Sequence, residues 1–256
     1  MKSYNEDLKV ILIEEDNVRL KTLIEGRTAK GASSCLLGAM PNIFTKSKFD
    51  KASFQMMIKY SLGVSIVKKS HACPDCGVIM DKFGEHAMTC RVSSARIAKH
   101  NCLVDIIANT VKNCGITTSA NKHFMPSDNR EMPGVIFISD FDLLGDAYFD
   151  VSVINILCPS YLQKSSKGAL CGSDIRYEEK KKKYPALGGQ LKPLIVECTG
   201  GWNSFSFKYL KMIAELVASR KNQSVKKIMK TLLSSLSVSL QRQQGAMLVR
   251  RCLSLA

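Results

Sequence analysis

Four side chains of the kinds that bind soft metal ions are closely spaced in the first half of the chain. They are Cys73, Cys76, His86 and Cys90, in the arrangement Cys-x2-Cys-x9-His-x3-Cys. Thiolates and imidazoles bind zinc tetrahedrally, and pairs with this spacing let two turns supply all the ligands. Because four protein ligands leave no open position, the spacing predicts a structural zinc. Two alternatives remain open: chance spacing of core thiols, and competition from the nearby imidazole of His71.

Asp150 and Glu197 each lie inside an apolar run that is typical of a buried strand. A buried carboxylate is costly unless it meets a cation or a hydrogen-bond donor. Between them, Lys180 to Lys183 lie on a predicted helix and cover about 300° around its axis, so at least one lysine must face the sheet. Such carboxylates can hold Mg²⁺, which polarises a phosphodiester. The alternative is structural: a capped Asp150, a Glu197 paired with a lysine, and a solvated lysine run.

Periodic apolar residues predict the elements that must position these side chains. Apolar positions recur every three or four residues in helices and alternate in strands. The first predicted helix has an apolar stripe that includes Ile97 and Leu103. The predicted helices span 93–112, 175–184, 205–221 and 225–241, and the predicted strands span 135–138, 147–154 and 194–198. This order indicates an α/β domain behind the metal module. Shorter helical patterns precede that module, over 18–24 and 52–62.

Composition and charge narrow the class of protein. With 256 residues, 45% hydrophobic and 23% charged, the chain has globular composition, which argues against wholesale disorder. No apolar run is long enough for a membrane span, and the first residues have no signal-peptide pattern, so we expect an intracellular location. Ten cysteines in such a chain indicate reduced thiols, some of them holding metal. The net charge of +15 favours a polyanionic partner, with a solvated basic surface as the alternative. A membrane surface ranks last, because there is no lipidation motif.

Taken together, the motifs resemble the carboxy-terminal part of non-LTR retrotransposon polyproteins that carry a CCHC knuckle followed by a restriction-like endonuclease. The resemblance covers roughly residues 32–215 and depends on the order and spacing of short motifs. After the knuckle these motifs are Arg96-x3-His100-Asn101, Met132-Pro133-Gly134-Val135, Asp150-Val151-Ser152-Val153 and Lys180-x2-Lys183-Tyr184. The resemblance divides the chain into a helical connector over 1–70, following a reverse transcriptase region, a CCHC knuckle over 71–92, an endonuclease domain over 93–245 and a tail over 246–256.

The resemblance implies a PD-(D/E)xK nuclease fold, with a central mixed sheet flanked by helices. Such a domain nicks target DNA with Mg²⁺ or Mn²⁺, and the nick primes reverse transcription. By position, Asp150 corresponds to the second metal-binding carboxylate. Lys180 and Lys183 correspond to lysines displaced onto the helix, Tyr184 to the tyrosine that follows them, and Glu197 to an acidic residue of the last core strand. The implied partners are DNA and the RNA of the element, and the implied location is the nucleus.

One residue departs from the family pattern. The family has an aspartate about 15 residues before Asp150, where this chain has Val135. Valine cannot ligate Mg²⁺, so weakened metal binding and catalysis are expected. Asp140 would replace the missing aspartate only after a shift of register. Two functions therefore remain open: a metal-dependent DNA endonuclease impaired by Val135, and a catalytically inactive, zinc-containing nucleic-acid-binding domain.

Overall fold

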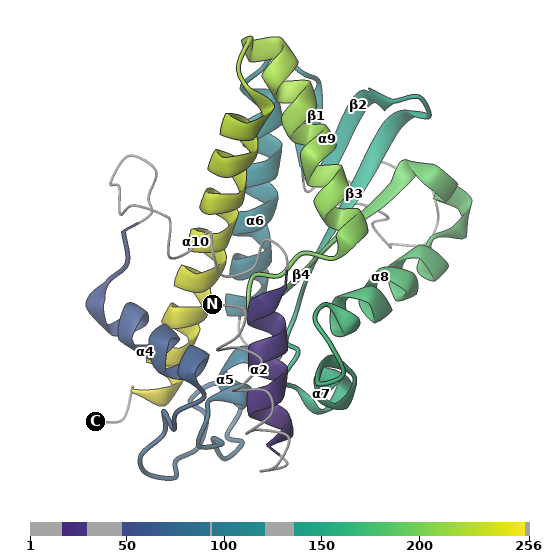
Figure 1. The fold of residues 1–256 in the computed structure, drawn as a ribbon. Coiled ribbons are helices and arrows are strands. Elements are labelled where there is room, and N and C mark those ends of the chain that lie inside the picture. Colours follow the sequence, from purple (N-terminus) through teal and green to yellow (C-terminus); the bar gives the residue numbers. More distant parts are fainter. Residues whose placement is uncertain (1–16, 30–47, 93, 121–135, 254–256) are drawn as a thin grey trace.

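The structure is a computed structural model that describes residues 17–29, 48–92, 94–120 and 136–253 (Figure 1). These residues form helices packed around one sheet. The helices are α2 (Val18–Thr28), α4 (Lys51–Leu62), α5 (Glu85–Thr89), α6 (Ala95–Lys112), α7 (Pro159–Ser165), α8 (Cys171–Lys183), α9 (Ser204–Lys221) and α10 (Val225–Cys252), with a 3-10 helix η1 (Pro185–Gln190). The strands are β1 (Thr118–Ala120), β2 (Ile136–Asp142), β3 (Gly145–Ile154) and β4 (Leu191–Glu197).

The four strands form one mixed sheet in the order β1-β2-β3-β4. β2 pairs antiparallel with both β1 and β3, whereas β3 and β4 are parallel. The β2–β3 hairpin closes at Gly145, whose φ of 82° is a conformation that only glycine adopts without steric cost. A parallel pair needs a crossover connection, and the segment that contains α7 and α8 supplies it.

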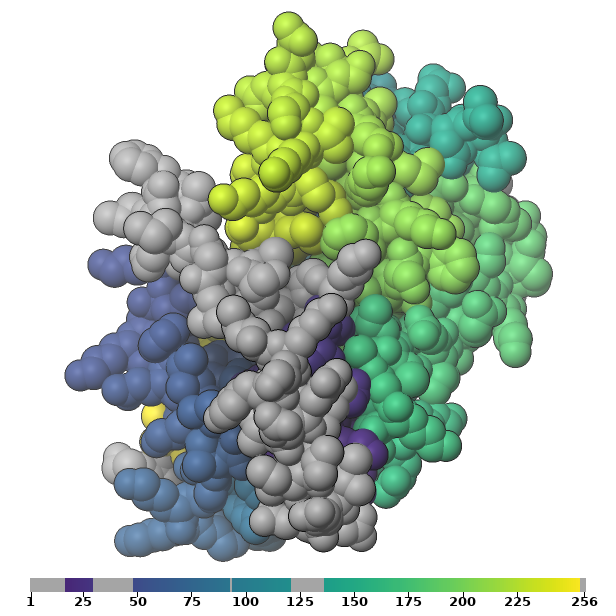
Figure 2. Space-filling model, viewed as in Figure 1, coloured from purple at the N-terminus to yellow at the C-terminus, as the bar shows by residue number. Residues whose placement is uncertain are grey.

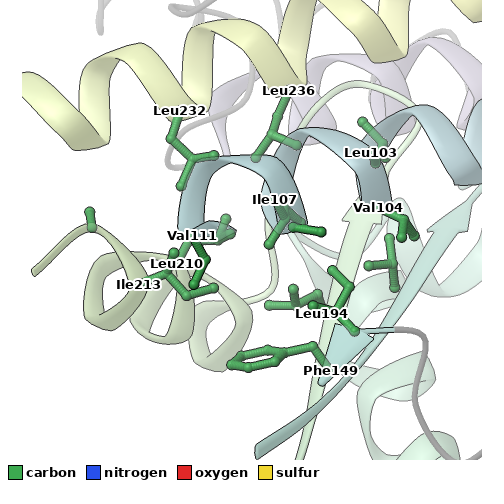
Figure 3. Close-up of a cluster of buried hydrophobic side chains, with 14 of the residues drawn as sticks. Leu103, Val104, Ile107, Val111, Phe149, Leu194, Leu210, Ile213, Leu232 and Leu236 are labelled. Carbon is green, nitrogen blue, oxygen red and sulfur yellow. The ribbon is translucent and has the colours of Figure 1, made fainter. Parts of the chain in front are cut away.

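Helices α6, α9 and α10 cover one face of the sheet. Successive side chains of a strand point to opposite faces, and Phe149 of β3 and Leu194 of β4 point to this one. There they pack with buried side chains such as Ile107 of α6, Ile213 of α9 and Leu236 of α10 (Figure 3). The alternation therefore turns Asp150 and Ile195 toward the opposite face, which α8 covers.

A second buried cluster lies at one end of the sheet. It contains Leu23 of α2, Met57 of α4, Tyr177 of α8 and Leu248 near the end of α10, together with apolar residues of the segment around the Cys/His motif. Figure 2 shows that segment (blue) at one end of the molecule, and the junction of α9 and α10 (yellow-green) at the other. The amino-terminal helices and the motif are thus packed onto the α/β part.

The structure confirms the α/β class with a mixed sheet flanked by helices, and each helix and strand predicted after residue 93 is present. Two expectations are wrong. Ile97 is 63% exposed, because α6 turns it away from the core. The residues expected as a tail continue α10 as far as Cys252 and bury Leu248 against the amino-terminal part. Within the described ranges, none of the helices has the length and apolarity needed to cross a membrane.

Candidate metal centre and carboxylate–lysine site

The four motif residues come together in a Cys3His cluster, formed by Cys73, Cys76, His86 and Cys90. Their ligand atoms all lie within 4.8 Å of one another. The Sγ atoms of Cys73 and Cys90 are 4.0 Å apart, and Sγ of Cys76 lies 3.1 Å from Nε2 of His86. Tetrahedral zinc with Zn–S bonds of about 2.3 Å places its sulfur ligands about 3.8 Å apart. The ligand atoms and their spacing therefore fit one zinc ion. Cys73, Cys76, His86 and Cys90 would hold it.

Two tight turns place the ligands of this cluster. In the first, the N–H of Gly77 donates to the carbonyl of Cys73 at 2.9 Å, and Gly77 has a φ of 75°. The second turn has Gly84 at a φ of 77°, directly before α5. The carboxylate of Asp81 accepts the N–H of His86 at 2.7 Å and so orients the start of this short helix. The local sequence therefore builds the cluster without help from the sheet.

His71 does not compete for the metal. Its Nε2 lies 2.9 Å from the carbonyl of Arg251, and its Nδ1 lies 3.0 Å from the carbonyl of Lys69. These two carbonyls stabilise the protonated ring and raise the pKa of His71, the Arg251 carbonyl most of all. Both ring nitrogens of His71 therefore contact backbone carbonyls, and His71 is not a metal ligand in this structure. With four protein ligands, the cluster can act as a structural metal site.

The end of α10 clamps the first turn of the cluster. Asp75 accepts a hydrogen bond from Nε of Arg251 at 2.7 Å and forms an ion pair with Arg250 at 2.5 Å. Arg251 is fully buried, and its guanidinium also donates to the carbonyl of Ala87. The hydrogen bond from Arg251, with the charges of both arginines, keeps the pKa of Asp75 below its ordinary value. The sequence pattern contained no sign of this contact, because its partners are far apart in the chain.

The carboxylate–lysine site lies on the face of the sheet that α8 covers. Asp150 is 5% exposed, and its Oδ2 lies 2.6 Å from Nζ of Lys180. Within the described chain Oδ2 has no well-directed hydrogen-bond donor, so the contact is an ion pair rather than an aligned hydrogen bond. The expectation that one lysine of the run faces the sheet is confirmed, and that lysine is Lys180.

Glu197 lies on the same face as Asp150 but at another level of the sheet. The parallel register pairs Asp150 with Pro193 and Glu197 with Ile154. Four residues therefore separate the two backbone positions along the strands, about 13 Å at about 3.3 Å per residue. Each carboxylate also has its own partner, Lys180 for Asp150 and Ser173 for Glu197. Among the described contacts, no partner is shared by the two carboxylates.

Glu197 meets the start of α8 instead. It is 1% exposed, and its Oε1 accepts the N–H of Ser173 at 3.3 Å. Burial raises the pKa of Glu197 to about 7, although the hydrogen bonds from Ser173 act in the opposite direction. This carboxyl group is therefore close to half protonated at neutral pH, which suits a hydrogen-bonding role better than metal ligation.

The remaining predicted residues lie around the end of α8 or outside the described ranges. Nζ of Lys183 lies 5.1 Å from the ring centroid of Tyr184, in a cation–π contact at the end of the helix. Val135 is outside the described residues. Asp140 lies toward the β2–β3 hairpin, where its N–H donates to Asp146 at 3.0 Å. Because the hairpin end of β3 lies about 13 Å from Asp150, Asp140 does not replace a ligand there.

Comparisons with known proteins do not assign a family to the chain. No protein-family model matches it, and no curated protein matches it significantly. The motifs of the chain, and the geometry that brings them together, are therefore the basis for proposing a function.

Proposed function

We propose that this chain is the zinc-knuckle and restriction-like endonuclease region of a non-LTR retrotransposon polyprotein, and that it binds nucleic acid. The observation that carries the proposal is the ion pair between Asp150 and Lys180, on a mixed sheet that follows a Cys3His cluster. A PD-(D/E)xK nuclease brings a strand carboxylate and a lysine together in this way. The order of α6, the β2–β3 hairpin, α8 and β4 also supports that fold.

The charge of the chain supports nucleic acid as the partner. Lys and Arg number 37 against 22 Asp and Glu. An excess of this size attracts phosphate backbones and makes binding depend on salt, because bound phosphates release counterions. The partners that we propose are target DNA and the RNA of the element, and a DNA target implies action in the nucleus.

Binding is the activity that we propose for the chain as it stands, with weak or absent cleavage. Asp150 is already paired with Lys180, and Glu197, four residues further along the paired strands, accepts a hydrogen bond from Ser173. The other expected ligand position holds Val135. Mg²⁺ gives up its water reluctantly and needs summed negative charge, which one neutralised carboxylate does not supply.

A titration of the whole zinc-loaded chain against labelled DNA and RNA tests the proposed binding. We expect the affinity to fall about tenfold or more between roughly 50 and 200 mM salt, since several phosphates are neutralised. An affinity that hardly changes with salt would contradict phosphate-driven binding. No binding of either nucleic acid at low salt would reject the proposed function.

Nicking of DNA is the second candidate, and the Asp150–Lys180 contact is the observation that favours it. The test is cleavage of supercoiled plasmid with Mg²⁺ or Mn²⁺. We expect Val135→Asp to create metal-dependent nicking and Val135→Asn to leave the chain inactive, because asparagine supplies an oxygen without charge. If the aspartate variant folds and stays inactive, this candidate is rejected. If the unchanged chain nicks DNA briskly, cleavage rather than binding alone is its function.

A further inference from the structure

A basic pocket lies between the Cys3His cluster and the sheet, apart from the Asp150–Lys180 pair. Its volume is about 740 Å³. Residues after the cluster, the start of α6, the end of β3 and the α7–α8 region form its walls. Of the lining residues that the structure describes, five are basic and none is acidic. The basic ones are Arg91, Arg96, Lys99, His100 and Arg176.

Lys99 is the unusual member of this set. It is 7% exposed and lines the pocket, and among the described residues its ammonium group has no carboxylate or carbonyl partner, although the Cys198 thiol lies within electrostatic reach. A buried ammonium without a partner is costly, and a protein interior tolerates it when an anion can reach it. Burial, and to a smaller extent the charge of Arg96, lowers the pKa of Lys99 to about 8. The side chain is still largely protonated at neutral pH.

The arginines of the pocket differ in their exposure and in whether they already have an acidic partner. Arg91 and Arg96 are exposed at the rim of the pocket. Arg176 is partly neutralised by Glu179, which lies 2.8 Å away. Lys99 is therefore the buried cation of the pocket, and Arg96, three residues before it in α6 and close enough to affect its charge, is an exposed one.

The remaining lining residues offer surface that a nucleotide could contact in addition to its phosphate. Tyr161 and the exposed side chain of Ile97 offer surfaces against which a base or sugar can pack. A pocket of several hundred Å³ also holds ligands much larger than one phosphate group. Ser152 lines the pocket two residues beyond Asp150 in β3, about 7 Å along the strand and on the same face. A strand held here would pass close to the carboxylate–lysine site.

We propose that this pocket binds a backbone phosphate of single-stranded nucleic acid, with Lys99 as its buried anchor. Arg96 neutralises the phosphate from the rim, and Tyr161 packs against the attached nucleotide. The inference rests on the proposed nucleic-acid function and names the subsite that holds the strand. Lys99 is a binding residue in this account, and no chemical step is assigned to it.

The test compares two variants that each remove one positive charge from α6. Lys99→Met replaces the buried lysine, and Lys112→Met replaces an exposed lysine at the other end of the same helix. The probe is a labelled single-stranded DNA of about 20 nucleotides, titrated at low and physiological salt. We expect at least a tenfold loss of affinity for Lys99→Met and less than a twofold loss for Lys112→Met. Equal losses would overturn the proposal, because they would reflect net charge alone.

Thermal stability separates this role from a structural one. Methionine fills the same space without a buried charge, so Lys99→Met should be at least as stable as the unchanged chain. If that variant does not fold, Arg96→Gln at the exposed rim takes its place in the titration. A folded Arg96→Gln with unchanged affinity would then overturn the proposal.

Two further arms identify the ligand. Duplex DNA of the same sequence should lose less affinity than the single strand in Lys99→Met, and a larger loss would reject the single-strand assignment. Tripolyphosphate should stabilise the unchanged chain against heat but not Lys99→Met. If it does so while no nucleic acid binds, the proposed nucleic-acid function is wrong, but the pocket is still an anion-binding site. If tripolyphosphate binds as tightly as the oligonucleotide, the pocket serves a free anion and the strand proposal is wrong.

Discussion

The Cys3His cluster and the Asp150–Lys180 pair are assembled in opposite ways. The cluster draws its four ligands from a single segment, in which turns at Gly77 and Gly84 bring them within 4.8 Å of one another. Asp150 and Lys180 lie on separate elements and meet because α8 packs across β3 and β4. One site is local in the chain, and the other exists only in the folded sheet.

The stability of the two sites should therefore have different sources. Because the cluster brings three thiols and an imidazole together, we expect its segment to depend on a bound zinc ion for its fold. The pair neutralises itself, and its strength depends on burial and on both partners being present. A closely spaced ligand motif can thus be read from a sequence, whereas a buried ion pair has to be found in a structure. Four experiments test this difference.

The largest effect is expected from loss of a zinc ligand. Cys76→Ser should reduce bound zinc from one ion per chain to well below one. It should also lower the free energy of unfolding by about 4 kcal/mol or more. The effect should reach α10, because Arg251 packs onto the turn of the cluster through Asp75. Metal analysis and urea unfolding measure both quantities. Cys114→Ser, at a cysteine outside the cluster, is the control, and unchanged zinc content in Cys76→Ser would contradict the assignment.

The second experiment removes the cation of the buried pair. Lys180→Met should cost about 3 to 5 kcal/mol of stability, because it leaves the Asp150 carboxylate buried without a partner. Adding Asp150→Asn should recover part of that loss. Lys182→Met, at an exposed position of the same lysine run, should cost about 0.5 kcal/mol or less. If chemical unfolding shows similar losses of stability for Lys180→Met and Lys182→Met, the buried ion pair does not stabilise the fold more than an exposed lysine does.

The third experiment uses pH, and its target is Glu197. The pKa of Glu197 is about 7 in the folded chain, against an ordinary value of 4.5. The folded state therefore binds the proton more tightly, and this contribution to stability is lost as the pH rises from 4.5 to 7. The loss should amount to about 3 kcal/mol. Glu197→Gln keeps an acceptor for Ser173 and should flatten that part of the stability profile. An unchanged profile in the variant would show that another group titrates there.

The smallest effect concerns the arginines that hold the cluster to α10. Arg250 is 56% exposed in its ion pair with Asp75, so Arg250→Met should cost less than about 1 kcal/mol. Arg251→Met should cost several times more, because the fully buried guanidinium also bonds to Ala87. Denaturant unfolding of the two variants side by side gives the comparison. Equal losses of unfolding free energy in the two variants would mean that burial of the guanidinium does not determine how strongly each arginine stabilises the contact with Asp75.

Much of the secondary structure could be predicted from the order of residues. Apolar residues recur at helical spacing in α6 and α10, and at alternate positions in β3, because one face of each element is buried. The short elements β1, α5 and α7 have too few residues to show a period, and the prediction missed them. The exposure of Ile97 was also missed, because its position in the helical stripe does not reveal where the sheet ends.

The Cys3His cluster could be predicted from the amino-acid sequence alone, because its ligands and turn-forming glycines lie within one segment and local geometry suffices to join them. The sequence also indicated that some lysine of the run would face the sheet, since four consecutive helical positions cover most of a turn. That this lysine is Lys180, and that the Glu197 position lies four residues along the paired strands from the Asp150 position, could be learned only from the folded chain. Strand register and helix packing set these positions, and both depend on contacts between segments far apart in the chain.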